Sequence, residues 1–278
     1  MAKWKELNRT EHDNLFTATN NISMNYRVYC NASEYKKTVL FLYGFDGSIE
    51  MCQLLTGFLS SDYRVIIVDY PGHCYSPICN RDYLLDELSD SINELLDFIG
   101  TERVVLWGYS FGGIISLNFY EKFSDRVESY IFQHSSTNFS PNLFKKIFYG
   151  YYLIFLYLNF KITINYLSIP LLKDKFFTKE LSKLAKVITM YNDKKSVINL
   201  FKKIIFNNFD NILKLIKCPI LVIGSEVDFL VSVKETKRIF NLIKSEKQIM
   251  IYKDIGHLSI VSSPETIYND VKIFINNN

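Results

Sequence analysis

Short runs of consecutive apolar residues alternate along the chain with stretches in which apolar residues recur every three or four positions. Such runs are typical of strands buried on both faces of a parallel sheet, and the periodic stretches are typical of covering helices. Six runs fit parallel strands, at 38–43, 63–69, 103–107, 129–132, 219–224 and 248–252, and segments at 15–19 and 24–30 suit a leading antiparallel pair. The pattern predicts an α/β fold: a mostly parallel sheet covered by helices on both faces.

Apolar stripes with a period of 3.6 residues predict the positions of several helices. One stripe runs from Leu85 to Ile99, a second from Ile115 to Phe123, and a third lies at 233–243. The last predicted helix has Ser263 at its N-cap and Pro264 at its first helical position, where the missing N–H of proline costs nothing. These stretches supply the layers that an α/β sheet requires.

The alternation stops between residues 138 and 211. This stretch lacks Gly-bounded strands and is rich in Phe, Tyr, Leu and Ile, above all in Ile147–Phe160. Those fourteen uncharged residues are too few to cross a bilayer. A helix on a membrane surface is a second interpretation, but the run lacks the strongly polar opposite face that such helices have. We predict one domain, with a core of residues 1–137 and 212–278 and a helical lid inserted at 138–211.

Composition limits the classes of partner and the cell compartment that we expect for this protein. The 278 residues include 32 basic and 29 acidic side chains, a net charge of +3, and no broad basic field points to nucleic acid. The five cysteines are odd in number and follow no metal-ligand spacing. The first ten residues lack the apolar core of a signal peptide. We expect a cytoplasmic protein with no metal, no cofactor, no nucleic-acid partner and no stable membrane insertion; its oligomeric state is left open.

The motif Gly108-Tyr109-Ser110-Phe111-Gly112 follows directly on the apolar run at 104–107 and leads into a helical pattern. A strand that reverses sharply into a helix needs residues without a Cβ where the two backbones approach. The serine at the apex of such a turn, a nucleophile elbow, projects its hydroxyl above the sheet. The placement favours Ser110 as a nucleophile over an ordinary Gly-rich turn.

A serine hydroxyl needs a base to accept its proton at neutral pH. Among four histidines, His257 follows the final strand at the carboxyl edge, where ligands meet such sheets. His134 also follows a strand end, and both a site role and a structural role stay open for it. Asp228 follows the strand at 219–224 and would orient the base, with Glu226 as the rival carboxylate and helix capping as another role for Asp228. The chain order Ser110, Asp228, His257 is the order that this architecture requires.

The oxyanion of a tetrahedral intermediate needs N–H donors already in place. One predicted donor is the backbone N–H of Phe111, directly after the nucleophile, and the other is that of Phe45, in the turn after the strand at 38–43. Together they would form an oxyanion hole. We expect Tyr43, Gly44 and Tyr109, which flank these residues, to contact the substrate.

These motifs resemble the α/β-hydrolase superfamily, and the resemblance covers nearly all the chain outside the lid. The loop Asp69-Tyr70-Pro71-Gly72-His73-Cys74-Tyr75-Ser76 is similar to the Asp-x-Pro-Gly-x-Gly-x-Ser loop of that family. Two positions depart from it: Tyr43 stands where the family usually has a histidine, and Cys74 where a glycine is common. The match is closest to small single-domain enzymes, namely carboxylesterases, carbon–carbon bond hydrolases and the menaquinone-pathway synthase.

The resemblance implies a serine hydrolase that uses a Ser-His-Asp triad on a small, hydrophobic carboxylic ester or related acyl substrate. The same triad serves carbon–carbon bond hydrolysis or elimination in relatives, and the sequence does not separate these reactions from ester or thioester hydrolysis. A ligand-binding protein that keeps the fold without turnover is the third alternative.

Overall fold

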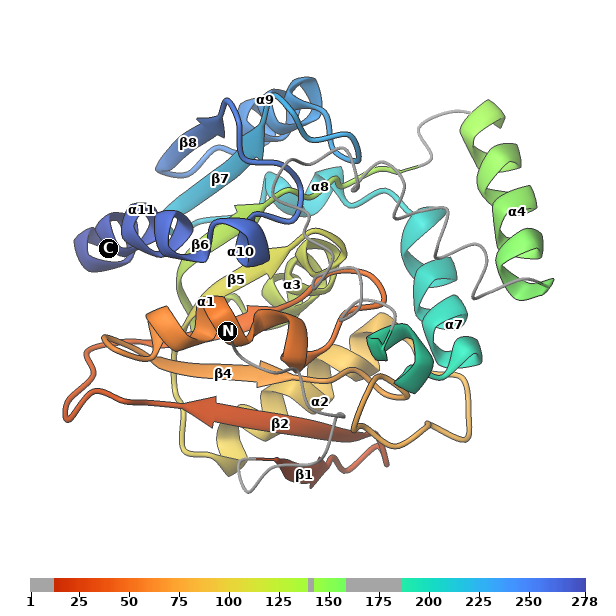
Figure 1. Cartoon of the computed structure of the whole chain (residues 1–278), viewed down its shortest axis with the longest axis horizontal. Coiled ribbons are helices and arrows are strands. Elements are labelled where there is room, and N and C mark those ends of the chain that lie inside the picture. The colour runs from red at the N-terminus through yellow and green to blue at the C-terminus, as the bar shows by residue number, and fades with distance from the viewer. Residues whose placement is uncertain (1–12, 140–142, 159–186) are drawn as a thin grey trace.

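The computed structural model describes residues 13–139, 143–158 and 187–278 (Figure 1). Within them a single eight-stranded sheet has the order β1-β2-β4-β3-β5-β6-β7-β8. Its strands are β1 (Asn14–Thr17), β2 (Ser23–Tyr29), β3 (Thr38–Leu42), β4 (Arg64–Val68), β5 (Val104–Tyr109), β6 (Val127–Gln133), β7 (Ile220–Ser225) and β8 (Lys247–Tyr252). The pairs β1–β2 and β2–β4 are antiparallel and the remaining pairs are parallel. The predicted fold class and all the predicted strands are confirmed.

Helices cover both faces of this sheet (Figure 1). On one face lie α1 (Ile49–Leu59), α10 (Ser259–Ser262) and α11 (Pro264–Asn277), which pack against one another. On the other lie α2 (Leu85–Phe98), α3 (Phe111–Lys122), α8 (Asp210–Leu213) and α9 (Val233–Leu242). A 3₁₀ turn, η1 (Ser124–Arg126), leads into β6. Because both faces are covered, every residue of β3, β5 and β7 is buried.

The order of the strands shows that the direction of winding changes at β3. After β3 the chain forms β4 on one side of it and then crosses to form β5 on the other side. In open α/β sheets, ligands bind where the direction of winding changes, beyond the carboxyl ends of the strands. The turn after β3 and the turn after β5 are therefore neighbours at the place where a site is expected.

The first turn of α3 packs directly on the end of β3. A Cβ added to Gly112 would lie 2.1 Å from the carbonyl oxygen of Leu42 and 2.4 Å from that of Tyr43. Real Cβ atoms do not come so close to backbone, so only glycine permits this contact. The glycine thereby sets the distance between the two turns.

The helices α4 (Leu143–Leu158) and α7 (Lys194–Ile205) pack together at the right of Figure 1, beyond the end of β4. Their small shared core holds Leu153, Val197, Ile198 and Ile205. The predicted lid at 138–211 includes residues 140–142 and 159–186, which lie outside the described residues, so its boundaries stay a prediction. None of the described helices has the length and apolarity needed to cross a membrane.

We predict that Gly112→Ala lowers the free energy of unfolding by about 3 kcal/mol, because the new methyl group overlaps two carbonyl oxygens that belong to a buried strand end. Gly57→Ala is the matched control. Gly57 is exposed within α1 and an added Cβ there meets nothing within 4 Å, so this substitution should raise stability by about 0.5–1 kcal/mol. Urea denaturation of both variants tests the pair, and equal stabilities would refute the tight contact.

Candidate active site

Ser110 is held in a strained backbone conformation at the apex between β5 and α3. Its φ of 53° and ψ of −123° lie in a region that residues with a Cβ rarely adopt, at a cost of about 1–3 kcal/mol. The backbone N–H of Ser110 donates to the carbonyl oxygen of Gln133 at 2.8 Å, which ties the apex to β6. The geometry is that of the predicted elbow.

Three side chains from separate segments meet at this apex. The Ser110 hydroxyl lies 2.8 Å from Nε2 of His257, and Nδ1 of His257 lies 2.8 Å from Oδ2 of Asp228. His257 is 6% exposed and the Asp228 side chain is fully buried, whereas Ser110 is half-buried. A proton can therefore pass from the hydroxyl to the ring along one continuous set of hydrogen bonds.

Asp228 uses its two oxygens differently. Oδ1 accepts the backbone N–H groups of Leu230 and Val231 at 2.8 and 2.9 Å, so the carboxylate also stabilises its own turn, while Oδ2 faces His257. Burial alone would raise the pKa of Asp228, but His257 and His134 beside it bring that pKa well below its usual range. An ionised carboxylate only accepts, so Nδ1 of His257 carries a proton and Nε2 accepts from Ser110.

The rival carboxylate, Glu226, is exposed on the same loop, whereas Asp228 is buried. Its backbone N–H pairs with the carbonyl oxygen of Tyr252 and continues the β7–β8 ladder. Asp228, two residues further along the loop than Glu226, is therefore the acid that is buried beside His257.

The turn after β3 lies over the serine. A Cβ added to Gly44 would be 3.1 Å from Cβ and 3.5 Å from Oγ of Ser110. The rings of Phe45 and Phe111, the two residues whose N–H groups were predicted to form the oxyanion hole, are 5.6 Å apart. Neither N–H has an acceptor among the residues that the structure describes. Their role as an oxyanion hole stays a prediction.

Tyr43 anchors this turn. It is 1% exposed, and its hydroxyl donates to Oδ1 of Asp69 and accepts the backbone N–H of Tyr70, both at 3.2 Å. The same Asp69 oxygen accepts the N–H of Ile49, the first residue of α1, at 2.9 Å. Burial raises the pKa of Asp69 to about 7. The tyrosine thus supports the turn from within, where the family usually has a histidine.

Tyr109 is also buried, and its hydroxyl donates to the carbonyl oxygen of His257 at 2.6 Å. The side chains of Tyr43 and Tyr109 therefore have positioning contacts with the protein. Gly44 has no side chain and lies directly beside Ser110. A contact of any of these three residues with a substrate stays a prediction.

Comparison with known proteins supports the assignment of this architecture. The family model described as the alpha/beta hydrolase fold matches residues 37–153. An esterase from Exiguobacterium antarcticum superposes with a TM-score of 0.83 at 15% identity, over 94% of this chain and 98% of that one. The chain therefore has the α/β-hydrolase fold.

Two curated proteins of similar sequence differ in how far they match this chain. A pimeloyl-[acyl-carrier protein] methyl ester esterase from Wigglesworthia glossinidia brevipalpis is 27% identical over 78% of this chain and 85% of its own length. The dihydrolipoyllysine-residue acetyltransferase component of the Pseudomonas putida acetoin cleaving system is 35% identical over 29% of this chain. The matched segment spans only 22% of that larger protein.

In this α/β-hydrolase fold, an unforeseen contact links the turn after β3 to the region between α4 and α7. Asp46, which has a positive φ of 52°, accepts from the Thr189 hydroxyl at 2.7 Å and from the Asn192 amide at 2.8 Å. Burial raises the pKa of Asp46 to about 6. No sequence signal marks this pairing, because its partners are more than 140 residues away and lie in no motif.

Aromatic rings pack beside the turn after β3. Phe201 of α7 packs against Phe45 with ring centroids 4.8 Å apart and against Phe111 at 5.9 Å. Tyr149 and Tyr152 of α4 lie against Phe201, with ring centroids 6.4 and 5.8 Å away. The aromatic stretch that was expected to cover the site therefore contacts both predicted oxyanion residues through one phenylalanine.

His134 is a second histidine beside Asp228. Its Nδ1 lies 3.0 Å from Oδ2 of Asp228, and its ring centroid lies 5.6 Å from that of His257. The ligand atoms of these three residues fall within 4.8 Å of one another, a spacing that a metal ion can also use. Both Nδ1 atoms point at one carboxylate oxygen at hydrogen-bond distance, however, which requires a proton on each nitrogen and suits donors better than metal ligands.

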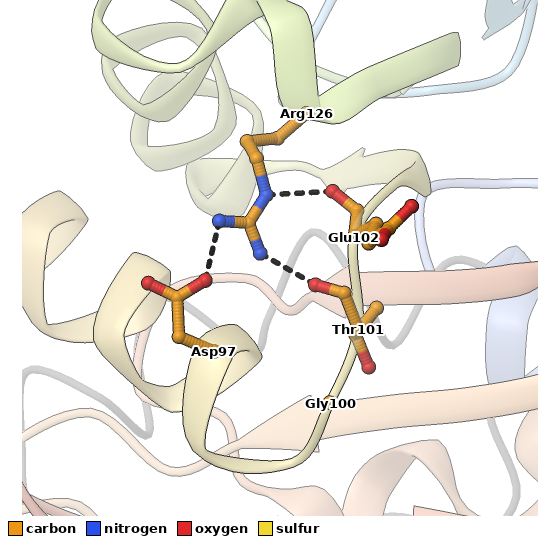
Figure 2. A pocket seen from close by; sticks show the side chains of 5 residues that line it. All are labelled: Asp97, Gly100, Thr101, Glu102 and Arg126. Atoms are coloured by element: carbon orange, nitrogen blue, oxygen red, sulfur yellow. Dashed lines mark hydrogen bonds and ion pairs between the residues drawn. The ribbon is translucent and has the colours of Figure 1, made fainter.

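A separate surface pocket lies at the opposite end of β5, before the strand begins. It has a volume of about 290 Å³ and is lined by Asp97, Gly100, Thr101, Glu102 and Arg126. Figure 2 shows the Arg126 guanidinium turned toward Asp97 and the carbonyl oxygens of Thr101 and Glu102. Arg126 therefore joins the end of α2 to the loop before β5 through its own hydrogen bonds. The pocket lies away from Ser110.

We predict that Tyr43→Phe lowers the free energy of unfolding by about 1–3 kcal/mol, because it leaves the buried Tyr70 N–H without its acceptor. It should also slow labelling of Ser110 by a fluorophosphonate about tenfold, because the turn above the serine loses its anchor. Tyr35→Phe, at an exposed tyrosine, is the control and should change neither quantity. Unchanged labelling in the Tyr43 variant would show that the anchor does not matter for the site.

Proposed function

We propose that this chain is a serine hydrolase that cleaves a small, hydrophobic carboxylic ester or a related acyl substrate. The observation that carries the proposal is the continuous path from the Ser110 hydroxyl through His257 to the buried Asp228 carboxylate, with both distances at 2.8 Å. That arrangement lets a neutral serine act as a nucleophile at physiological pH.

The proposed reaction has two halves. Ser110 Oγ attacks the carbonyl carbon while its proton moves to Nε2 of His257, and Asp228 stabilises the imidazolium that forms. The tetrahedral oxyanion accepts the N–H groups of Phe45 and Phe111. The carbon–oxygen bond to the leaving group then breaks, and His257 donates its proton to that alcohol. In the second half His257 takes a proton from water while the water oxygen attacks the acyl carbon. The bond between that carbon and Ser110 Oγ then breaks, which releases the acid, and His257 returns the proton to Oγ.

The strained apex supports the first half. Ser110 stands at a positive φ between β5 and α3, and its hydroxyl projects toward His257. In a turn of this kind the N–H of the residue after the serine is a donor to the oxyanion. Within the described part of the chain the N–H groups of Phe45 and Phe111 donate to no other group, which leaves them available to an oxyanion.

The aromatic cluster supports a hydrophobic acyl group. Phe201, Tyr149 and Tyr152 lie beside the turn that carries Phe45, and such rings bind apolar groups by removing their surface from water. Two proteins similar to this chain carry the name esterase, one from Wigglesworthia glossinidia brevipalpis and one from Exiguobacterium antarcticum. We therefore propose a small-molecule ester as the partner of the site. We also propose a reducing, cytoplasmic location, which suits the five free cysteines.

We predict that the wild-type chain hydrolyses p-nitrophenyl esters of graded acyl length and that Ser110→Ala lowers kcat/KM at least about 10³-fold. Ser61→Ala, at an exposed serine beyond α1, is the matched control and should keep full activity. Serine labelling by a fluorophosphonate without ester or thioester turnover would favour carbon–carbon bond hydrolysis or elimination. If the protein shows neither labelling nor turnover, the hydrolase proposal is wrong and a ligand-binding protein is favoured.

A further inference from the structure

His134 occupies a costly position. It follows β6 directly, is completely buried and has a φ of 48°. This left-handed region is unfavourable for a residue with a side chain, although histidine enters it more often than most. Its backbone N–H donates to the carbonyl oxygen of Ile223 at 2.8 Å, so the strained residue is fixed against β7. A buried imidazole at a strained position must gain from contacts that a glycine there would lack.

The principal contact of the ring is with the acid of the proposed triad. Nδ1 of His134 and Nδ1 of His257 lie 3.0 and 2.8 Å from the same atom, Oδ2 of Asp228. Oδ1 accepts two backbone N–H groups on its own loop. A carboxylate offers about four acceptor positions, so the four donors saturate Asp228. The two imidazoles hold Oδ2 from β6 on one side and from the loop after β8 on the other.

We propose that His134 is a positioning residue that holds Oδ2 of Asp228 in line with His257, so that the ring of His257 stays directed at Ser110. The inference rests on the proposed function of Ser110, His257 and Asp228. His134 does not touch the reacting atoms and acts only through the carboxylate. Two backbone donors bind Oδ1 and leave the carboxyl group some freedom to rotate. The hydrogen bond from Nδ1 of His134 to Oδ2 restricts that rotation.

The bond also has an electrostatic consequence. The hydrogen bond from His134 offsets part of the negative charge on Oδ2, and that charge is what stabilises a protonated His257. This effect is present whether His134 is neutral or protonated. Tyr109 of β5 also lies beside His134, with ring centroids 6.4 Å apart, and its hydroxyl donates to the carbonyl oxygen of His257 at 2.6 Å. Loss of His134 should therefore make His257 hold its proton to higher pH.

The test compares two substitutions at position 134. His134→Gly removes the donor and suits the positive φ. His134→Asn tolerates the same backbone and restores an N–H donor. Thermal melting checks that each variant folds. If the glycine variant does not fold, His134→Ser replaces it, because its short hydroxyl does not reach Oδ2.

We predict that the donor-lacking variant lowers kcat about 10- to 100-fold with little change in KM, and moves the acid limb of the kcat/KM profile to higher pH. The asparagine variant should recover kcat to within about threefold and return the acid limb toward its original position. Unchanged kcat and unchanged acid limb in a folded donor-lacking variant would overturn the inference. An asparagine variant as impaired as the glycine variant would also overturn it.

A second readout needs no substrate. The ring resonances of His257, followed by NMR against pH in the free protein, should have their titration midpoint at higher pH in the donor-lacking variant than in the wild type. An unchanged midpoint overturns the inference. Because this measurement involves no turnover, failure of the proposed hydrolase activity leaves it intact. Ester turnover with an unchanged midpoint would instead reject the role of His134 alone.

Discussion

The close packing of α3 on the end of β3 is the constraint on which the site depends. The backbone of Gly112 lies against the carbonyl groups of Leu42 and Tyr43, and this contact places the turn after β3 over the apex after β5. Ser110 is forced to a positive φ by the same reversal of the chain, and the cost of that strain is met by the buried strands around it. Without the contact, the turn that carries Phe45 would not lie beside Ser110.

The surroundings of the apex are held by three independent anchors. Tyr43 and Asp69 fix the turn from inside the sheet, Asp46 joins it to Thr189 and Asn192, and Phe201 packs on Phe45 and Phe111. Both carboxyl groups are buried away from water, and this burial raises the pKa of Asp46 to about 6 and that of Asp69 to about 7. Desolvated hydrogen bonds of this kind are strong and directional, so the turn that carries Phe45 is held in place before any substrate binds.

Local patterns were enough to predict the strands and the helices α2, α3, α9 and α11, and to name candidate residues for the site. The elbow at Ser110 and the loops with Asp228 and His257 each stand directly beyond an apolar strand, so their common edge followed from the parallel sheet. Helix α1 was not predicted. It packs against strands on one side and against α10 and α11 on another, so its apolar residues do not form a single stripe, and Gly57 interrupts the helical pattern. The contacts of Asp46 and of His134 depend on side-chain direction across long sequence separations, which no local pattern encodes. For His134 the position beyond a strand was visible, but its partner was not.

The account turns on whether Ser110 becomes covalently acylated during turnover. The most direct measurement is rapid acid quenching during hydrolysis of a slowly deacylating ester, followed by intact mass spectrometry and peptide mapping. We predict one acyl adduct on the peptide that contains Gly108–Gly112, located at Ser110 and absent from Ser110→Ala. Hydrolysis that proceeds with no adduct, or with the adduct on another residue, would contradict the account.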